Sequence, residues 1–239
     1  MSAPAPAARP RGTGLVESAV VLLPLALCVG LVTRVGPAVG TGVLAVVVGL
    51  VVPVVATWAL VRRRPAVVSP PDVATLARVA LTGVVATATV LVLADQLPAR
   101  TWAVALVVGA ALLLDAVDGW LARATGTASP AGARLDMESD AALLLVLSVL
   151  AAVTLGWWVL AIGALRYVFV LASWVRPALR GELTPSLARR VVAAVQGIAL
   201  LVALVPVVPP PLATAGVALA LAALLVSFGR DVVDLESRR

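Results

Sequence analysis

Long apolar runs separated by short polar turns dominate this chain. The runs cover residues 15–32, 39–61, 73–93, 102–122, 136–155, 157–175, 190–205 and 212–228. A helix needs about 20 apolar residues to cross roughly 30 Å of hydrocarbon, and the runs are close to that length. They lack the alternation of polar and apolar residues that marks a membrane β-strand. The pattern therefore predicts an all-α, polytopic transmembrane bundle of about eight spans.

The composition supports a membrane protein. Hydrophobic residues make up 62% of the 239 residues and charged residues only 13%, whereas soluble domains have roughly half and a quarter. The single cysteine, Cys28, excludes an intramolecular disulfide. Because the chain has no histidine, a metal site would use carboxylate or carbonyl oxygens, which favours Mg²⁺ or Mn²⁺.

The positions of the arginines predict the orientation. If the N-terminus is inside, the inner turns carry Arg62, Arg63, Arg64, Arg78, Arg123, Arg134, Arg176, Arg180, Arg189 and Arg190, and the C-terminal tail carries Arg230, Arg238 and Arg239. The outer turns carry only Arg34 and Arg100. By the positive-inside rule both termini should be cytoplasmic.

The same arginines indicate which partners to expect. They are scattered between apolar spans without an aromatic-studded basic surface, so we expect membrane lipid and phosphate groups rather than nucleic acid as partners. All basic residues are arginine, and Ala and Val are abundant. This composition is typical of a GC-rich bacterial genome. We expect the protein in the inner (plasma) membrane of a bacterium, with its active site on the cytoplasmic side.

Five of the twelve acidic residues fall between Asp115 and Asp140. Asp115 and Asp118 are three residues apart and Asp136 and Asp140 four apart, so each pair should share one face of a helix. Asp115 should lie about 10 Å below the interface if the helix ends near residue 122. A carboxylate facing lipid there costs about 2.5 to 3.5 kcal/mol, so we expect the four to point inward and bind two divalent cations. The alternative is that they are solvated loop residues, with Asp136 and Asp140 favoured at a helix start.

From residue 115 to 140 the sequence reads DAVDGWLARATGTASPAGARLDMESD. It fits Asp-x2-Asp-Gly-x2-Ala-Arg-x8-Gly-x3-Asp-x3-Asp at every specified position and resembles the signature of the CDP-alcohol phosphatidyltransferase family (class I). Residues 71–78, PDVATLAR, also resemble the Pro-Asn-x-x-Thr-x-x-Arg opening of the family's first core helix, with Asp72 in place of Asn.

This resemblance implies a function and a set of site residues. Asp115, Asp118 and Asp136 would bind two Mg²⁺ or Mn²⁺ ions, and Asp140 would act as general base while also approaching the metals. The nucleotide site would include Asp118, Gly119, Ala122, Arg123 and Gly132. Taken singly, the two glycines would equally suit helix packing or a turn. The implied reaction transfers a phosphatidyl group from CDP-diacylglycerol to an alcohol and releases CMP.

Further arginines are candidates for binding the acceptor or its phosphate. They are Arg166, which lies deep in an apolar run, then Arg176, Arg180, Arg189 and Arg190, together with Gln196. An anionic acceptor such as glycerol 3-phosphate or an inositol phosphate suits these charges, while serine and phosphatidylglycerol stay open as alternatives. Structural ion pairs or membrane anchoring would also explain the arginines.

The predicted organisation has five parts. They are a disordered cytoplasmic tail (1–14), two extra N-terminal helices (15–61), a cytoplasmic linker (62–70), the six-helix family core (71–230) and a cytoplasmic tail (231–239). An alternative function is a membrane transporter or assembly protein that keeps the fold and metal site without transferase activity. The sequence leaves open the acceptor, the metal used, the role of the extra helices and whether the protein forms a homodimer as relatives do.

Overall fold

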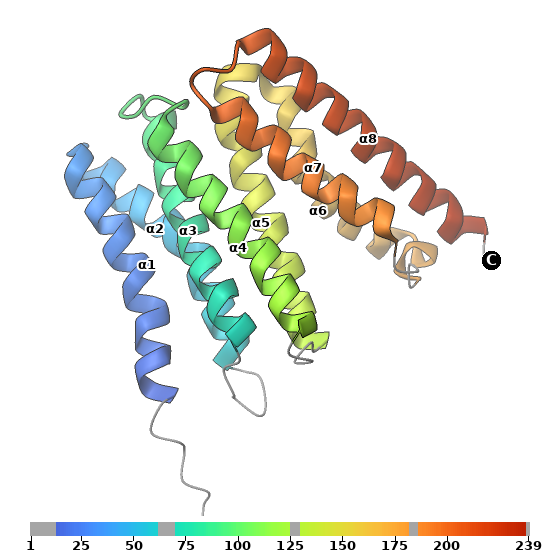
Figure 1. Ribbon diagram of the computed structural model, residues 1–239, viewed down its shortest axis with the longest axis horizontal. Coiled ribbons are helices and arrows are strands. Elements are labelled where there is room, and N and C mark those ends of the chain that lie inside the picture. Colours follow the sequence, from blue (N-terminus) through green and yellow to red (C-terminus); the bar gives the residue numbers. More distant parts are fainter. Residues whose placement is uncertain (1–12, 62–69, 125–129, 182–185, 238–239) are drawn as a thin grey trace, which may run out of the picture.

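The computed structural model describes residues 13–61, 70–124, 130–181 and 186–237, and within these ranges it is all-helical (Figure 1). The eight α-helices are α1 (Thr13–Val35), α2 (Val39–Val61), α3 (Pro70–Leu93), α4 (Trp102–Ala124), α5 (Pro130–Leu155), α6 (Leu160–Val175), α7 (Leu187–Leu204) and α8 (Pro210–Ser237). Short 3₁₀ turns, Trp157–Val159 and Pro177–Arg180, flank α6. The predicted all-helical bundle with eight helices is confirmed.

Six of these helices are long and apolar enough to cross a membrane. The candidate spans are Val39–Ala59, Val73–Leu93, Arg134–Leu155, Trp157–Val175, Leu187–Leu204 and Pro210–Ser237. α1 and α4 contain shorter apolar stretches, Leu22–Val35 and Trp102–Val117, among the residues that are described. The helices therefore form a membrane bundle by length and composition.

Several helices extend beyond the apolar runs that predicted them. α5 begins at Pro130 instead of residue 136, and α8 continues to Ser237, through most of the predicted tail 231–239. A proline at the first position suits a helix start, and polar end turns can leave the membrane without losing helical hydrogen bonds. The predicted tail 1–14 and linker 62–70 lie outside the described residues, except for residues 13, 14 and 70.

Helix α3 forms the centre of the bundle and packs against α1, α2, α4 and α5. Of the residues in its most apolar stretch, 72% are buried, a larger share than in any other candidate span. Three of its buried threonines, Thr82, Thr87 and Thr89, donate hydroxyl hydrogen bonds to carbonyls four residues earlier. These three hydroxyls are thus satisfied within the helix, so this part of α3 can be enclosed by other helices.

The two N-terminal helices are packed closely onto α3. A Cβ added to Gly83 on α3 would lie 2.5 Å from the carbonyl oxygen of Gly49 on α2. A Cβ added to Gly49 would lie 3.1 Å from the sulfur of Cys28 on α1. Only glycine allows the backbones to approach this closely. The extra helices are therefore part of one bundle with the helices that follow.

Similar contacts join the second half of the bundle. Gly163 on α6 faces the backbone of α5, since an added Cβ would lie 2.5 Å from the Cα of Leu145. At one end, Arg100 in the α3–α4 loop donates a 2.7 Å hydrogen bond to the carbonyl of Val205, and another to that of Val208, in the α7–α8 connection. Figure 1 shows these two connections at the end opposite the one where α4 leads to α5.

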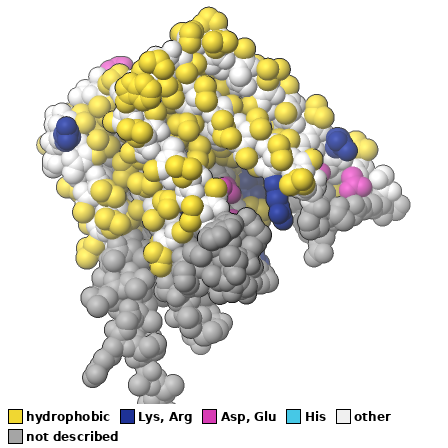
Figure 2. All heavy atoms as spheres, viewed as in Figure 1, with side chains coloured by type: hydrophobic (Ala, Val, Ile, Leu, Met, Phe, Trp, Pro, Cys, Tyr) yellow, Lys and Arg dark blue, Asp and Glu magenta, His cyan; other side chains and the backbone are white. Residues whose placement is uncertain are grey.

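The outer surface is hydrophobic and carries tryptophans near both ends of the helices. Trp102 and Trp157 are exposed at one end, and Trp58 and Trp174 are exposed near the helix ends on the other side. In the view of Figure 2, hydrophobic side chains cover most of the described face, and charged side chains are confined to its margins and to one recess. Aromatic residues at two levels around an apolar band are typical of membrane-spanning proteins.

Candidate metal centre

Three aspartates from two helices converge in the bundle. Asp115 lies on α4, and Asp136 and Asp140 lie one turn apart on α5. Each offers one carboxylate oxygen, and these three oxygens all lie within 4.8 Å of one another. The side chains are 38%, 38% and 43% exposed, so the cluster is open on one side. The three groups are close enough to share a single cation.

The cluster belongs to the helical part of the bundle. α4 continues for nine residues after Asp115, and α5 begins six residues before Asp136, which places the cluster about 9 to 14 Å from these helix ends. Asp136 and Asp140 share a face, as their spacing predicts. All three aspartates lie within helices and are therefore not loop residues. Asp136 and Asp140 lie beyond the first turn of α5, past the reach of the favourable helix start.

An arginine from a third helix contacts all three carboxylates. Arg78 on α3 donates from Nη1 to Asp115 Oδ1 and, at 2.5 Å, to Asp140 Oδ1. Its Nη2 donates to Asp136 Oδ1 at 2.6 Å and, more weakly, to the Asp136 carbonyl at 3.5 Å. The Arg78 side chain is fully buried, whereas its three partners are partly exposed. α3, α4 and α5 thus each supply part of the site.

The donor set fits a hard divalent cation. All three ligand atoms are carboxylate oxygens, which suit Mg²⁺ or Mn²⁺ better than metals that prefer sulfur or imidazole. Three carboxylates and one guanidinium leave two net negative charges, which one divalent cation would balance. In the space-filling view, acidic and basic side chains lie together in the recess of the described face (Figure 2).

The remaining motif residues lie along the same two helices. Asp118, Gly119, Ala122 and Arg123 lie in the last turns of α4, and Gly132 lies in the first turn of α5. Their side chains are outside the part of the chain that the structure describes. The backbone therefore places the predicted nucleotide residues on the two helix ends that follow and precede the carboxylate cluster.

Three of the predicted acceptor arginines form ion pairs between elements. Arg166 on α6 donates to Glu138 on α5 at 2.5 Å, and Glu138 lies between Asp136 and Asp140 in the sequence. The other two pairs join the end of α8 to its neighbours, Arg176 with Glu236 at 2.6 Å and Arg189 with Asp231 at 3.0 Å. Because Glu138 is two residues from both Asp136 and Asp140, it lies on a different face of α5 from these two aspartates.

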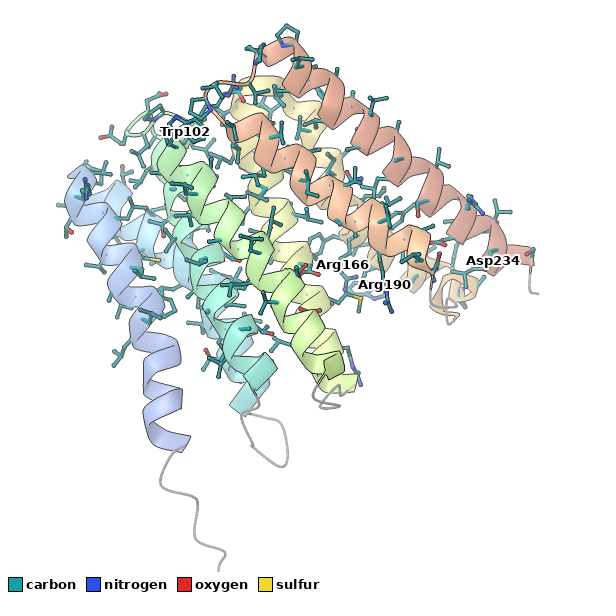
Figure 3. All side chains as sticks on the ribbon, viewed as in Figure 1. Trp102, Arg166, Arg190 and Asp234 are labelled. Carbon is teal, nitrogen blue, oxygen red and sulfur yellow. The ribbon has the colours of Figure 1, made fainter. Side chains whose placement is uncertain are left out.

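The other three acceptor candidates differ in position and in burial. Arg190 is exposed on α7, and Figure 3 shows Arg190 and Arg166 at about the same level along the bundle. Arg180 lies in the 3₁₀ turn after α6, and its side chain is outside the described part. Gln196 is fully buried, and its amide donates to the carbonyls of Val192 and Ala220. Its contacts join α7 to α8.

Arg78 is the site residue that the sequence reasoning missed. The prediction that Arg78 lies in an inner turn is wrong, because Arg78 lies eight residues into α3 and is fully buried. The signal was present in the chain. An arginine inside an apolar run, at the end of PDVATLAR, needs an acidic or polar partner within the bundle.

Comparison with known proteins places this site in a family. The family model for CDP-alcohol phosphatidyltransferase matches residues 68–228, about two thirds of the chain. The match includes α3 to α7 and most of α8, with Arg78 and the three carboxylates, and leaves out α1 and α2. No curated protein and no solved structure matches the chain. With its carboxylate cluster inside the matched region, the chain belongs to the CDP-alcohol phosphatidyltransferase family.

Proposed function

We propose that this protein transfers the phosphatidyl group of CDP-diacylglycerol to an alcohol and releases CMP, with divalent metal as cofactor. The observation that carries the proposal is the convergence of Asp115, Asp136 and Asp140, within 4.8 Å, inside the region that matches the family. Carboxylates held together at this depth in an apolar bundle need a cation, and phosphoryl transfer depends on such charge.

In this proposal the four motif aspartates have two roles. Asp115, Asp118 and Asp136 hold the metal, Mg²⁺ or Mn²⁺, as two ions. When bound, these ions supply positive charge beside the pyrophosphate of the donor lipid. Asp140 accepts the proton of the acceptor hydroxyl and lies beside the same ions. The hydroxyl oxygen then forms a bond to the phosphatidyl phosphorus, and the bond from that phosphorus to the CMP oxygen breaks.

The CDP group would lie along the ends of α4 and α5. Gly119 and Gly132 have no Cβ and would allow a nucleotide close to the helix backbone, with Ala122 beside them. Arg123 would contact a phosphate with two parallel donors. The acyl chains would stay in lipid, against the hydrophobic outer surface of the bundle.

The acceptor in this proposal is a phosphorylated polyol, such as glycerol 3-phosphate or an inositol phosphate. Arg166 supports it, because an arginine inside an apolar helix that pairs with an acidic side chain can also bind a phosphate. An acceptor phosphate would share Arg166 with Glu138 or replace it. Arg176, Arg180, Arg189 and Arg190 would add positive charge around the entrance. Gln196 would act from within the bundle, because its side chain is fully buried and its amide nitrogen joins α7 to α8.

The proposed location is the inner membrane of a bacterium, with the site near the cytoplasmic side. The support is the excess of arginine in the turns and helix ends on the side of the chain termini. The end of the bundle where α4 leads to α5 would then face the cytoplasm, where a soluble acceptor and CMP can enter and leave.

The direct test uses purified full-length protein in detergent with CDP-diacylglycerol and Mn²⁺ or Mg²⁺. Each of a panel of alcohols, including glycerol 3-phosphate, inositol phosphate, serine and phosphatidylglycerol, is added separately. CMP release and the masses of the lipid products are measured. One acceptor should give a new phospholipid together with an equal amount of CMP. No product with any acceptor, from folded protein, would favour the non-enzymatic transporter or assembly function.

A further inference from the structure

The metal centre has a buried side and an open side. Arg78 lies on the buried side, where its side chain has no solvent exposure. The three carboxylates that it contacts are each about 40% exposed and form the open side. A cation arriving from outside the bundle would therefore meet the carboxylates first, with Arg78 behind them.

We propose that Arg78 is a positioning residue that orients Asp115, Asp136 and Asp140 toward a shared divalent cation. This inference rests on the proposed function and deepens it. Arg78 binds one oxygen of each carboxylate from within the bundle. Because those oxygens are engaged by the guanidinium, the orientation of each carboxylate is fixed before the cation binds. Groups behind the direct ligands commonly control metal affinity in this way.

The shape of the guanidinium is essential to this role. Its two terminal nitrogens together reach two helices, with Nη1 contacting α4 and α5 and Nη2 contacting α5. A planar group with several fixed donors can hold three carboxylates in one arrangement. A lysine ammonium has the same charge but a single nitrogen, so it cannot reproduce the two separate donor positions.

Orientation can be separated from charge, because the two predict opposite effects. Removing the positive charge of Arg78 makes the cluster more negative, which by charge alone should tighten metal binding. Loss of orientation should weaken it, because three carboxylates that repel one another would move apart. A residue that only stabilises the fold would change the melting temperature and leave metal affinity as it is.

The experiment measures Mn²⁺ binding to purified full-length protein in detergent, without substrate, by the EPR signal of free Mn²⁺. The wild type is compared with Arg78→Lys and Arg78→Met, and thermal unfolding with and without Mn²⁺ is measured on the same samples. Both variants should bind Mn²⁺ at least about tenfold more weakly, the range typical when a residue behind the direct ligands is lost. Thermal unfolding should show a smaller rise in Tm on adding Mn²⁺ than in the wild type.

Arg100→Lys is the matched control. Arg100 also donates between elements, but to carbonyls at the other end of the bundle. It should lower the melting temperature and leave the Mn²⁺ affinity unchanged. Wild-type affinity in Arg78→Lys, or tighter binding in Arg78→Met, would overturn the proposal. If Arg78→Met does not yield folded protein, Arg78→Lys decides, because it keeps both the charge and a long side chain.

The same samples separate this inference from the proposed reaction. Normal lipid product from the wild type, with unchanged Mn²⁺ affinity in Arg78→Lys, would reject the role of Arg78 and leave the reaction standing. Weakened Mn²⁺ binding in the Arg78 variants, with no product from the wild type and any acceptor, would support the role of Arg78 and reject the reaction. Absence of Mn²⁺ binding by folded wild type would reject both.

Discussion

At the scale of single residues, the site combines side chains that are costly to bury with partners that offset the cost. Asp115, Asp136 and Asp140 carry three negative charges in a bundle whose core is hydrophobic. Arg78 neutralises one of them, and its contacts from α3 explain how the cluster persists without solvation on its inner side. The two negative charges that remain would favour a divalent cation.

Asp140→Asn tests the assignment of the general base. An amide has nearly the same shape as the carboxylate but cannot accept the proton of the acceptor hydroxyl. We expect kcat to fall by about 10² to 10⁴, with CDP-diacylglycerol binding retained, because general bases contribute a factor of this size. Steady-state kinetics with CMP release as the readout, together with binding of the donor lipid, measure both effects.

Asp95→Asn is the control for that substitution. Asp95 is exposed in the α3–α4 loop and has a positive φ of 57°, a conformation that asparagine also tolerates. The control should keep full activity. Full activity in Asp140→Asn as well would remove Asp140 from the chemical step.

Arg166→Gln tests whether this arginine binds an anionic acceptor. A hydrogen bond to a charged group contributes about 1.5 to 3 kcal/mol, so the KM for a phosphorylated acceptor should rise by roughly ten- to a hundredfold. The KM for CDP-diacylglycerol should stay the same. Arg34→Gln, a change at the end of α1, serves as the control. An unchanged acceptor KM in Arg166→Gln would mean that Arg166 does not bind the acceptor and has only a structural role in its ion pair with Glu138.

At the scale of helices, close contacts at glycine fix how α2 and α3 cross. The backbones meet at Gly49 and Gly83, and Thr87 on α3 lies in the same contact. α3 also carries Arg78, one turn before this crossing begins. The position of α3 between the N-terminal pair and α4 therefore links the packing of the bundle to the geometry of the metal centre.

Gly83→Ala tests this crossing. The added methyl group would lie 2.5 Å from the Gly49 carbonyl oxygen, so the helices must separate. We expect a loss of about 1 to 3 kcal/mol in the free energy of unfolding, measured by denaturation in detergent. The matched control is Gly216→Ala on α8, where nothing lies within 4 Å. That change should be neutral or stabilising by up to about 1 kcal/mol, because alanine favours helix. Equal effects in both variants would contradict the close crossing.

The helices are easier to predict from this sequence than the site is. Apolar runs identified all eight helices because crossing a membrane imposes a length and a composition on each one. The helix ends were displaced, as at Pro130 and Ser237, because hydropathy marks the apolar part of a helix and gives no sign of polar turns beyond it. The spacing of Asp136 and Asp140 predicted a shared face. Arg78 was missed because its partners are 37 to 62 residues away in the chain, and spacing within one helix cannot reveal them.

At the scale of the whole molecule, the bundle consists of a buried central helix with helices on both sides of it. α1 and α2 lie outside the region that matches the family, yet they pack against α3 as closely as its other neighbours do. Figure 1 shows them on one side of α3, with α4 to α8 on the other. The family core thus has an N-terminal extension that shares its packing and contributes none of the described metal ligands.

Carboxylates from α4 and α5 are proposed to bind divalent cations together, and Mn²⁺ titration of the wild type and Asp136→Asn tests this most directly. Free Mn²⁺ is followed by EPR in chelator-treated protein, with Asp95→Asn as the control. Saturable binding is expected in the wild type and in the control, with affinity at least about tenfold lower in Asp136→Asn. Identical Mn²⁺ binding by wild type and Asp136→Asn would contradict the claim.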